Sequence, residues 1–337
     1  MPVATRRHVA ASLLGLSLGL PATTPGRRAH AQDSGIGDYP NRPVRFISPF
    51  PPGQAGDTHA RIAAEALGLR WPTRPVVENR PGGAGAIGME AVARSPADGY
   101  TFAYASIGPM NVLPVMVPTV PYDPGRDFAA VAILSVSPVL LVCHPSLPVR
   151  NIQEFVAYAK ENALDYASGG PGTVQHMAGE LLRHRLGLKL NHVAYRGSGP
   201  AVTDTIAGVV KVMVDSLSSA VPHIRNGRLR ALALTGGHGV PALPGIPSIG
   251  DSVAPGYDVN GWTGLFAPAG TPRAIIRKVN ADIWAGLTPG SELRQRLEAT
   301  GTIIPDPWDP DQAQDFINRQ IAFWRDVIRE AGLKIDA

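Results

Sequence analysis

The feature that most constrains the fold is a unit of local structure that occurs three times along the chain. A short apolar run typical of a strand is followed by a loop rich in glycine and proline, and then by an amphipathic segment that begins near a helix-capping residue. The units fall near residues 46–69, 165–186 and 192–207. This alternation predicts an α/β fold whose strands are connected through helices.

The repeated loops also predict where a ligand binds. Each unit places free backbone N–H groups and the positive end of a helix dipole at the carboxyl edge of a sheet, which is where ligands bind in open α/β sheets. Two such edges that face each other would form a cleft suited to an anion such as a carboxylate. The alternative is that these loops are only the short connections found in any α/β protein.

The excess of positive charge lies at the N-terminus. The formal charge is +4, and residues 1–31 hold Arg6, Arg7, Arg27 and Arg28 but no acidic residue, which leaves 27 basic and 27 acidic residues in the remainder. A neutral remainder argues against a nucleic-acid-binding face, which needs clustered Lys and Arg. We therefore predict no nucleic-acid partner.

Residues 1–31 have the organisation of an export signal. Two arginines precede an apolar stretch at 9–20 that is too short to span a bilayer, and Ala29-His30-Ala31 is a small-x-small cleavage pattern. We predict a signal peptide over 1–31 and a periplasmic mature protein, with a disordered tail as the alternative. Sec export is favoured and Tat export stays open, because the Phe-Leu-Lys that usually follows twin arginines is absent.

Motifs for catalysis and for cofactor or metal binding are incomplete. Gly83-x-Gly85-x-x-Gly88 fits a dinucleotide fingerprint, but it follows the second predicted strand and no acidic residue ends a strand about 20 residues later. His176, His184 and His192 are eight residues apart, so no two lie on adjacent helical turns. The single Cys143 lies in an apolar run and is interpreted as an inert buried thiol. The sequence therefore favours binding over catalysis and predicts no cofactor and no metal.

Short motifs follow one another over residues 39–330, nearly the whole mature chain. They are YPNRPV at 39–44, PFPPG at 49–53, ENRPG at 78–82, ADGYT at 97–101, YDP at 122–124, YAS at 166–168, YRGSGPA at 195–201, GRLRALA at 227–233 and GLFAPAGTP at 264–272. This series resembles the Bug family, the extracytoplasmic solute receptors of tripartite tricarboxylate transporters.

The resemblance implies a fold, a ligand class and a partner. The expected fold is α/β of the type II-like periplasmic binding protein kind, with two α/β domains joined by two crossing strands and a ligand cleft between them. We place domain 1 at 38–138 plus 262–305, domain 2 at 139–261, and a C-terminal helix that packs across both at 306–337. The resemblance implies a monomer that holds a small carboxylate through backbone groups, hydroxyls and water, and delivers it to membrane permease subunits.

The predicted ligand contacts lie in the loops that follow strands. They are Phe50, Pro51, Pro52, Gly53, Gln54, Asp57, Ser106, Ser168, Gly169, Gly172, Thr173, His176, Tyr195 and Asp215. Family members usually have Pro-Gly-Gly in the first loop, and here Gln54 replaces the second glycine, which adds bulk and an amide. Because of this departure, the ligand of a particular family member is a weak guide to the ligand of this chain.

Several of these residues have a structural alternative. Asp57 is either a ligand contact or the cap of the first helix. Tyr195 either covers an apolar ligand face or packs in the core. His176 is interpreted as a structural hydrogen-bonding residue rather than a titrating switch, and Trp262 as packing at the crossing strands rather than on the ligand.

Together these patterns predict a periplasmic receptor that closes by hinge motion on a small carboxylate: a di- or tricarboxylate, an amino acid or an aromatic acid. Two alternatives stay open. One is an exported enzyme that acts on a small organic acid, with His176 and Asp215 as a proton pair. The other is a sensory receptor that contacts a signalling ectodomain.

Overall fold

The computed structural model describes residues 36–117, 119–237, 239–300 and 302–330. The predicted signal peptide lies outside the described residues. The chain from Ile36 onward forms one compact unit. In the described ranges, no helix combines the length and the apolar character needed to cross a membrane.

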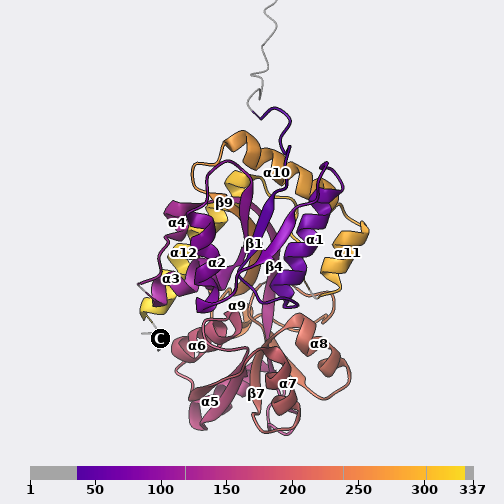
Figure 1. Cartoon of the computed structure of the whole chain (residues 1–337). Coiled ribbons are helices and arrows are strands. Elements are labelled where there is room, and N and C mark those ends of the chain that lie inside the picture. The colour runs from indigo at the N-terminus through magenta and orange to yellow at the C-terminus, as the bar shows by residue number, and fades with distance from the viewer. Residues whose placement is uncertain (1–35, 118, 238, 301, 331–337) are drawn as a thin grey trace, which may run out of the picture. The chain divides into compact units, whose positions relative to one another are not determined.

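Nine strands join in one sheet, in the order β2-β1-β3-β9-β4-β7-β5-β6, with β8 also paired to β4. The first strand group lies at the top of Figure 1, where β1 pairs in parallel with β2 and β3, and β9 pairs antiparallel with β3 and β4. Its strands are β1 (Arg45–Ser48), β2 (Val76–Asn79), β3 (Thr101–Ser106), β9 (Asn260–Pro268) and the first part of β4 (Phe128–Cys143). The helices of this part of the chain are α1 (Ala55–Gly68), α2 (Ala86–Ala93), α3 (Leu113–Met116), α4 (Pro124–Asp127), α10 (Arg273–Gly286), α11 (Glu292–Glu298) and α12 (Pro310–Glu330).

The second strand group follows β4 along the chain and lies at the bottom of Figure 1. β5 pairs in parallel with β6 and β7, while β7 and β8 pair antiparallel with the end of β4. Its strands are β5 (Leu164–Ser168), β6 (Leu190–Ala194), β7 (Val212–Ser216) and β8 (Arg230–Leu234). Its helices are α5 (Ile152–Glu161), α6 (Val174–Leu186), α7 (Ser198–Ile206), α8 (Leu217–Arg225) and α9 (Ile249–Ser252).

One long apolar strand, β4, runs from the first strand group into the second. β4 has 16 residues and pairs with β9 as far as Pro138, whereas from Val139 it pairs with β7 and β8. Proline has no N–H to give to a ladder, so Pro138 suits the point at which the strand changes partner. The exact division into domains at residue 138 stays a prediction.

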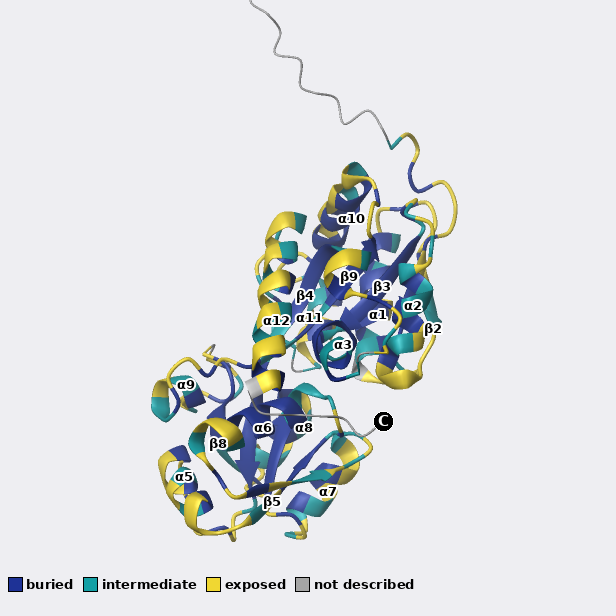
Figure 2. Cartoon of the chain, turned by 90° about the vertical axis from the view of Figure 1, so that its left-hand side faces the viewer, coloured by how far each residue is buried: buried dark blue, intermediate teal, exposed yellow. Residues whose placement is uncertain are grey.

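The core consists of apolar side chains on both faces of the sheet. In Figure 2 the strands of both groups are mostly dark blue, the colour of buried residues. Strands covered on both faces read as nearly continuous apolar runs, and β4 is buried along most of its length for this reason. The amphipathic C-terminal helix is confirmed: α12 packs on β4 and buries Ile317, Trp324 and Val327. Its packing across both domains stays a prediction.

Two of the predicted site residues lie at the start of a helix. Thr173 caps α6, because its Oγ1 accepts a hydrogen bond from the His176 N–H at 3.3 Å. The predicted cap of the first helix at Asp57 is wrong, since α1 begins at Ala55 and Gln54 occupies the cap position. Asp57 therefore lies in the first turn, where a carboxylate is also favourable to the helix dipole.

Candidate functional site

A pocket of about 580 Å³ opens where the carboxyl ends of strands from both groups meet. This volume is typical of sites for small molecules. In the first strand group, the walls come from the segments at the ends of three strands. These are residues 49–51 and 54 after β1, residues 81, 82, 84 and 85 after β2, and residues 106–109, 112 and 113 at and after the end of β3. After the second-group strands β5 and β7 they come from 171–175 and 216–218, and the floor comes from 135 and 137–139 on β4 and 261–263 on β9.

Helices from both strand groups begin at this pocket. Gln54, Thr173 and Ser216 are the N-cap residues of α1, α6 and α8, and all three line it. The first N–H groups of a helix have no partner within the helix, and the helix dipole places partial positive charge there. The pocket therefore collects these three helix N-termini, together with those of α2 and the short α3, whose N-cap residues Gly85 and Val112 also line it. This arrangement is suited to an anion.

Hydrogen bonds fix the loop that follows β1. Asp57 accepts from the Gly53 N–H at 2.9 Å, from the Asn79 side chain at 2.7 Å and from Arg61 at 3.1 Å. Burial by itself raises the pKa of Asp57, but the hydrogen bonds from Asn79, Gly53 and Arg61 outweigh it and hold the pKa below its usual value. The Asp57 carboxylate therefore stays charged, and its hydrogen bonds hold this loop in place.

The opposite wall depends on two histidines. The His192 Nε2 lies 2.7 Å from the Ser168 Oγ, and the Gly172 N–H donates to the His176 Nδ1 at 3.2 Å. The imidazole rings of His176 and His192 stack on each other. Ser168, His176 and His192 therefore support the loop whose residues 171–173 face the pocket.

The structure divides the predicted contacts into two sets. Phe50, Pro51, Gln54, Ser106, Gly172 and Thr173 line the pocket. Pro52, Gly53, Asp57, Ser168, Gly169, His176, Tyr195 and Asp215 are not among its lining residues. Tyr195 donates to Asp204 at 2.8 Å, and the buried Asp215 accepts from the Ser198 hydroxyl at 2.6 Å. Contact of any of these residues with a ligand stays a prediction.

Sequence reasoning missed the glycine-rich loop after β2. Its residues Pro81, Gly82, Ala84 and Gly85 line the pocket, whereas the sequence alone indicates only an incomplete dinucleotide fingerprint there. At Gly85, with φ at 100°, a Cβ would lie 3.1 Å from Pro109 and 3.3 Å from Pro49. Glycine here lets the β2 loop approach the two neighbouring walls closely.

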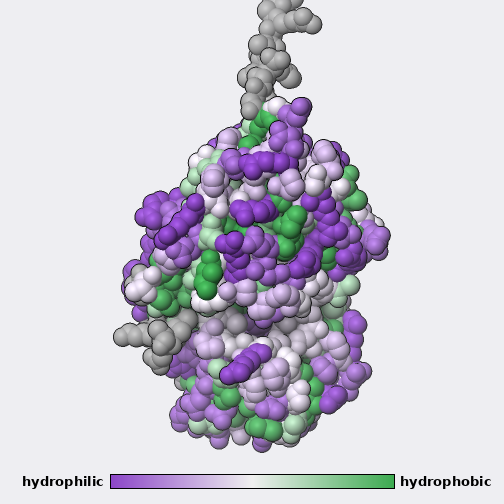
Figure 3. Space-filling view, viewed as in Figure 1, coloured by the Kyte–Doolittle hydropathy of each residue, from purple (hydrophilic) through white to green (hydrophobic). Residues whose placement is uncertain are grey.

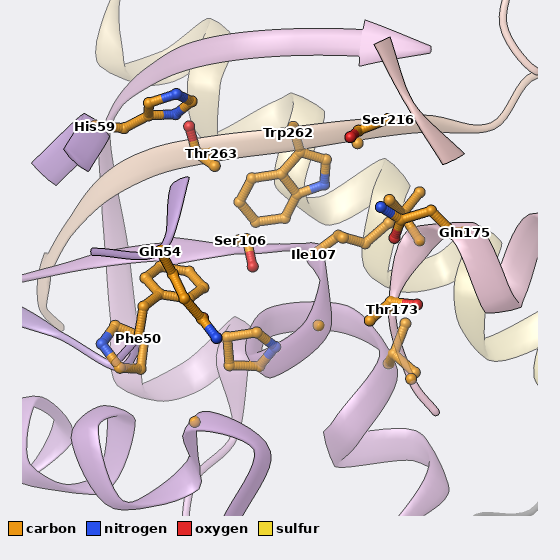
Figure 4. Close-up of a pocket in the computed structure, with 18 of the residues that line it drawn as sticks. Phe50, Gln54, His59, Ser106, Ile107, Thr173, Gln175, Ser216, Trp262 and Thr263 are labelled. Carbon is orange, nitrogen blue, oxygen red and sulfur yellow. The ribbon is translucent and has the colours of Figure 1, made fainter. Parts of the chain in front are cut away.

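The pocket also has a polar end that the sequence did not indicate. The His59 Nε2 lies 2.9 Å from the Thr300 Oγ1 and 3.2 Å from the Thr302 Oγ1. Nearby on the floor strands, the Ser135 and Thr263 hydroxyls are 2.8 Å apart. Figure 4 draws His59 and Thr263 together at one end of the pocket. Burial lowers the pKa of His59 to about 4, so this ring is neutral at pH 7.

Charged side chains are absent from the described lining of the pocket, which contains no Lys, Arg, Asp or Glu. In Figure 3, residues of intermediate hydropathy, drawn pale, gather around the hollow between the two strand groups. An anion here would be held by N–H groups, hydroxyls and helix dipoles rather than by a cation. The described residues also contain no cluster of three or more His, Cys, Asp or Glu side chains that could hold a metal.

Comparisons with known proteins agree with this geometry. The sequence model described as "Tripartite tricarboxylate transporter family receptor" matches residues 59–333. The UPF0065 protein in the tcbD-tcbE intergenic region of Pseudomonas sp. (strain P51) is 40% identical over 328 residues, which cover 96% of this chain and 94% of that protein. Protein BugT of Bordetella pertussis (strain Tohama I) is 34% identical over 300 residues, which cover 88% and 91% of the two chains.

A solved structure is similar over the same region. R. palustris Rpa4515 with adipate has 32% sequence identity and a TM-score of 0.76, and the match covers 88% of this chain and 99% of that one.

Proposed function

Because this chain belongs to the tripartite tricarboxylate transporter receptor family, we propose that it is a periplasmic receptor that binds a small carboxylate in its pocket and delivers it to membrane permease subunits. Family membership confirms the predicted resemblance to Bug receptors and the type II-like α/β fold. The family consists of receptors, so the alternative of an exported enzyme is wrong.

The observation that carries the proposal is that the N-termini of α1, α6 and α8 meet in one pocket without charged side chains among its described residues. Gln54 belongs to the first strand group, whereas Thr173 and Ser216 belong to the second. A carboxylate bound among them touches both groups at once. Contacts of this kind favour a closed form when the ligand is present, as hinge closure requires.

The proposed ligand class also has support from a relative. Rpa4515 is described with adipate, a carboxylate. The pocket of this chain offers the matching chemistry, with hydroxyl groups at Ser106 and Thr173 and an amide at Gln54. Within the described residues the Ser106 hydroxyl makes no hydrogen bond to protein and is available to a ligand oxygen.

Isothermal titration of the purified chain with citrate, adipate and benzoate tests the proposal. We expect at least one acid to bind, and Ser106→Ala to weaken that binding about threefold or more, because a hydrogen bond to a charged oxygen is lost. Ser95→Ala is the matched control, since the Ser95 hydroxyl donates to the Ala91 carbonyl of α2 and Ser95 does not line the pocket. If no acid binds, the proposal fails.

The delivery role and the location have their own tests. Deleting the gene should abolish uptake of the bound acid in cells that retain the permease. The processed chain should appear in the osmotic-shock fraction of the cell. Uptake that continues unchanged in the deletion strain would instead favour the sensory alternative.

A further inference from the structure

The polar end of the pocket contains a small group of hydrogen-bonded side chains. His59, Thr300 and Thr302 line the pocket there, beside the Ser135 and Thr263 hydroxyls. Thr300 and Thr302 are partly exposed, whereas His59 is 7% exposed and lies behind them in the bonding order. The two threonines are therefore open to the pocket and to a ligand in it.

The hydrogen atoms of this group can be placed from its partners. A hydroxyl carries one hydrogen. Thr300 donates its hydrogen to the Leu297 carbonyl oxygen at 2.6 Å, because a carbonyl can only accept. Thr300 must then accept from its two other neighbours, which are the Thr302 hydroxyl at 2.8 Å and the His59 Nε2 at 2.9 Å. The hydrogens of Thr300, Thr302 and the His59 Nε2 are thus all used within the group.

What Thr302 offers to the pocket is therefore an acceptor. After it donates to Thr300, its oxygen has two lone pairs, of which the His59 Nε2–H at 3.2 Å can use one. At least one lone pair is left for a donor in the pocket. A carboxylate oxygen has no hydrogen to give and would meet this lone pair with repulsion, so a carboxylate does not suit this end of the pocket.

The other side of the pocket has the opposite chemistry. Thr173 and Ser216 mark the N-termini of α6 and α8, where free N–H groups suit a carboxylate. Figure 4 draws Thr173 and Ser216 on the side away from His59 and Thr263. A ligand that satisfies both sides accepts hydrogen bonds at one end and donates one at the other.

The donor that fits best is a hydroxyl group. An ammonium group can also donate, but it would lose its hydration in a pocket whose described lining contains no Asp or Glu to compensate it. A hydroxyl carries no charge and needs only the acceptor that Thr302 supplies.

We propose that Thr302, held in place by Thr300 and His59, accepts a hydrogen bond from a hydroxyl group of the ligand. The receptor then selects a hydroxy acid over the same acid without the hydroxyl. This inference rests on the proposed function and deepens it, because it assigns the residues that read a second group of the ligand.

The test compares matched acids in calorimetric titrations of the full chain. The pairs are malate and succinate, citrate and tricarballylate, and para-hydroxybenzoate and benzoate, which differ within each pair by one hydroxyl. In at least one pair we expect the hydroxy acid to bind about tenfold or more tightly than its partner, because without the hydroxyl the site's acceptor stays unpaired. Aspartate, which has an ammonium group in place of the malate hydroxyl, should bind no more tightly than malate.

Variants at Thr302 assign the preference to this end of the pocket. Thr302→Val keeps the shape but removes the acceptor, and should reduce the preference in that pair to about threefold or less while the partner acid binds as before. Thr302→Ser keeps the hydroxyl and should keep the preference. Thr203→Val is the matched control, since Thr203 has an exposed hydroxyl on α7 and does not line the pocket.

A second measurement needs neither a ligand nor a Thr302 variant. In protein labelled with ¹⁵N-histidine, the ring signals that are missing in His59→Gln belong to His59. At pH 7 they should show a neutral ring with its hydrogen on Nε2. A hydrogen on Nδ1 would overturn the placement of hydrogens from which the acceptor at Thr302 follows.

The outcomes separate this inference from the function on which it rests. If no hydroxy acid binds more tightly than its partner, whichever acids bind, or if Thr302→Val keeps the preference, the role of Thr302 is overturned and the carboxylate receptor stands. Aspartate binding more tightly than malate overturns the hydroxyl as the group that is read. Failure of all these acids and of adipate to bind overturns the proposed function as well.

Discussion

The imidazole rings of His176 and His192 stack with their centroids 4.0 Å apart. Both rings are also tied to the loop that forms one wall of the pocket, His192 through Ser168 and His176 through Gly172. Burial lowers the pKa of both, and for His192 burial together with the neighbouring His176 brings it to about 4. The pair is therefore neutral in the folded protein at pH 7.

This stack predicts a loss of stability in mild acid. Below pH 6.5 the unfolded chain takes up protons that the folded His192 accepts only near pH 4, so the free energy of unfolding falls as the pH falls across this window. His192→Gln should lose less stability between about pH 7 and about pH 4.5 than the wild type, as measured by urea unfolding. His184→Gln, at an exposed position of α6, should lose as much as the wild type. Equal losses in all three proteins would contradict the expectation.

A buried carboxyl predicts the opposite dependence on pH. Burial raises the pKa of Asp215 from 3.8 to about 6, so the folded state keeps a proton that the unfolded state has released, and the free energy of unfolding falls as the pH rises through this range. Asp215→Asn stays neutral and can still accept from the Ser198 hydroxyl. It should raise the free energy of unfolding by about 1–3 kcal/mol above pH 7 and by little near pH 4.

Urea unfolding at the two pH values measures this effect. Asp165→Asn, at an exposed position of β5, is the control and should change stability little at either pH. A destabilised Asp215→Asn at high pH would show that the charged form is favoured in the fold, contrary to this account.

The sequence predicted the elements because their signals are local. The strand–loop–helix units near 46–69, 165–186 and 192–207 and the C-terminal helix α12 each depend on residues within a few positions of one another. The wrong cap at Asp57 also had a local signal. Asn79 lies across the sheet on β2 and binds that carboxylate, a partner that local patterns do not reveal.

The sequence predicts the pocket only where its wall is a loop that directly follows a strand. Phe50, Gln54 and Thr173 follow strands directly and were found. The sequence does not reveal that Trp262 and His59 line the pocket, because their position there depends on how distant parts of the chain pack together. The sheet inserts β9 between β3 and β4, and this order, set by long-range pairing, brings Trp262 to the floor of the pocket.

We expect Thr235 to stabilise the crossing between the two strand groups. Its buried hydroxyl accepts from the Val139 N–H at 2.9 Å and donates to the Val259 carbonyl at 2.7 Å. Val139 is the residue at which β4 changes partner, and Val259 immediately precedes β9. Thr235→Val keeps the shape but leaves the Val139 N–H without this partner, and should lower the free energy of unfolding by about 1–3 kcal/mol.

Chemical unfolding of a matched pair of variants measures this role. Thr203→Val removes an exposed hydroxyl that bonds within α7, and should change stability by no more than about 0.5 kcal/mol. If the two variants are equally stable, the Thr235 hydroxyl contributes nothing measurable at the crossing.

The close approach of β9 to β4 predicts a severe effect at Gly264. A Cβ at this position would lie 2.6 Å from the Ala132 carbonyl oxygen and 2.9 Å from the Ile133 side chain. The carbonyl is backbone, and the register of β4 against β9 shifts on both sides of it, so the strand must move for an alanine to fit. Gly264→Ala should lower the free energy of unfolding by about 3 kcal/mol or more, as overpacking against fixed atoms does.

Gly199→Ala is the control, because nothing lies within 4 Å of its added Cβ in α7 and alanine favours helix. Thermal unfolding followed by circular dichroism should show a large fall in Tm for the first variant and none for the second. A Gly264→Ala protein as stable as the wild type would mean that β4 and β9 can separate at low cost, and that the floor carrying Trp262 is less rigid than its packing indicates.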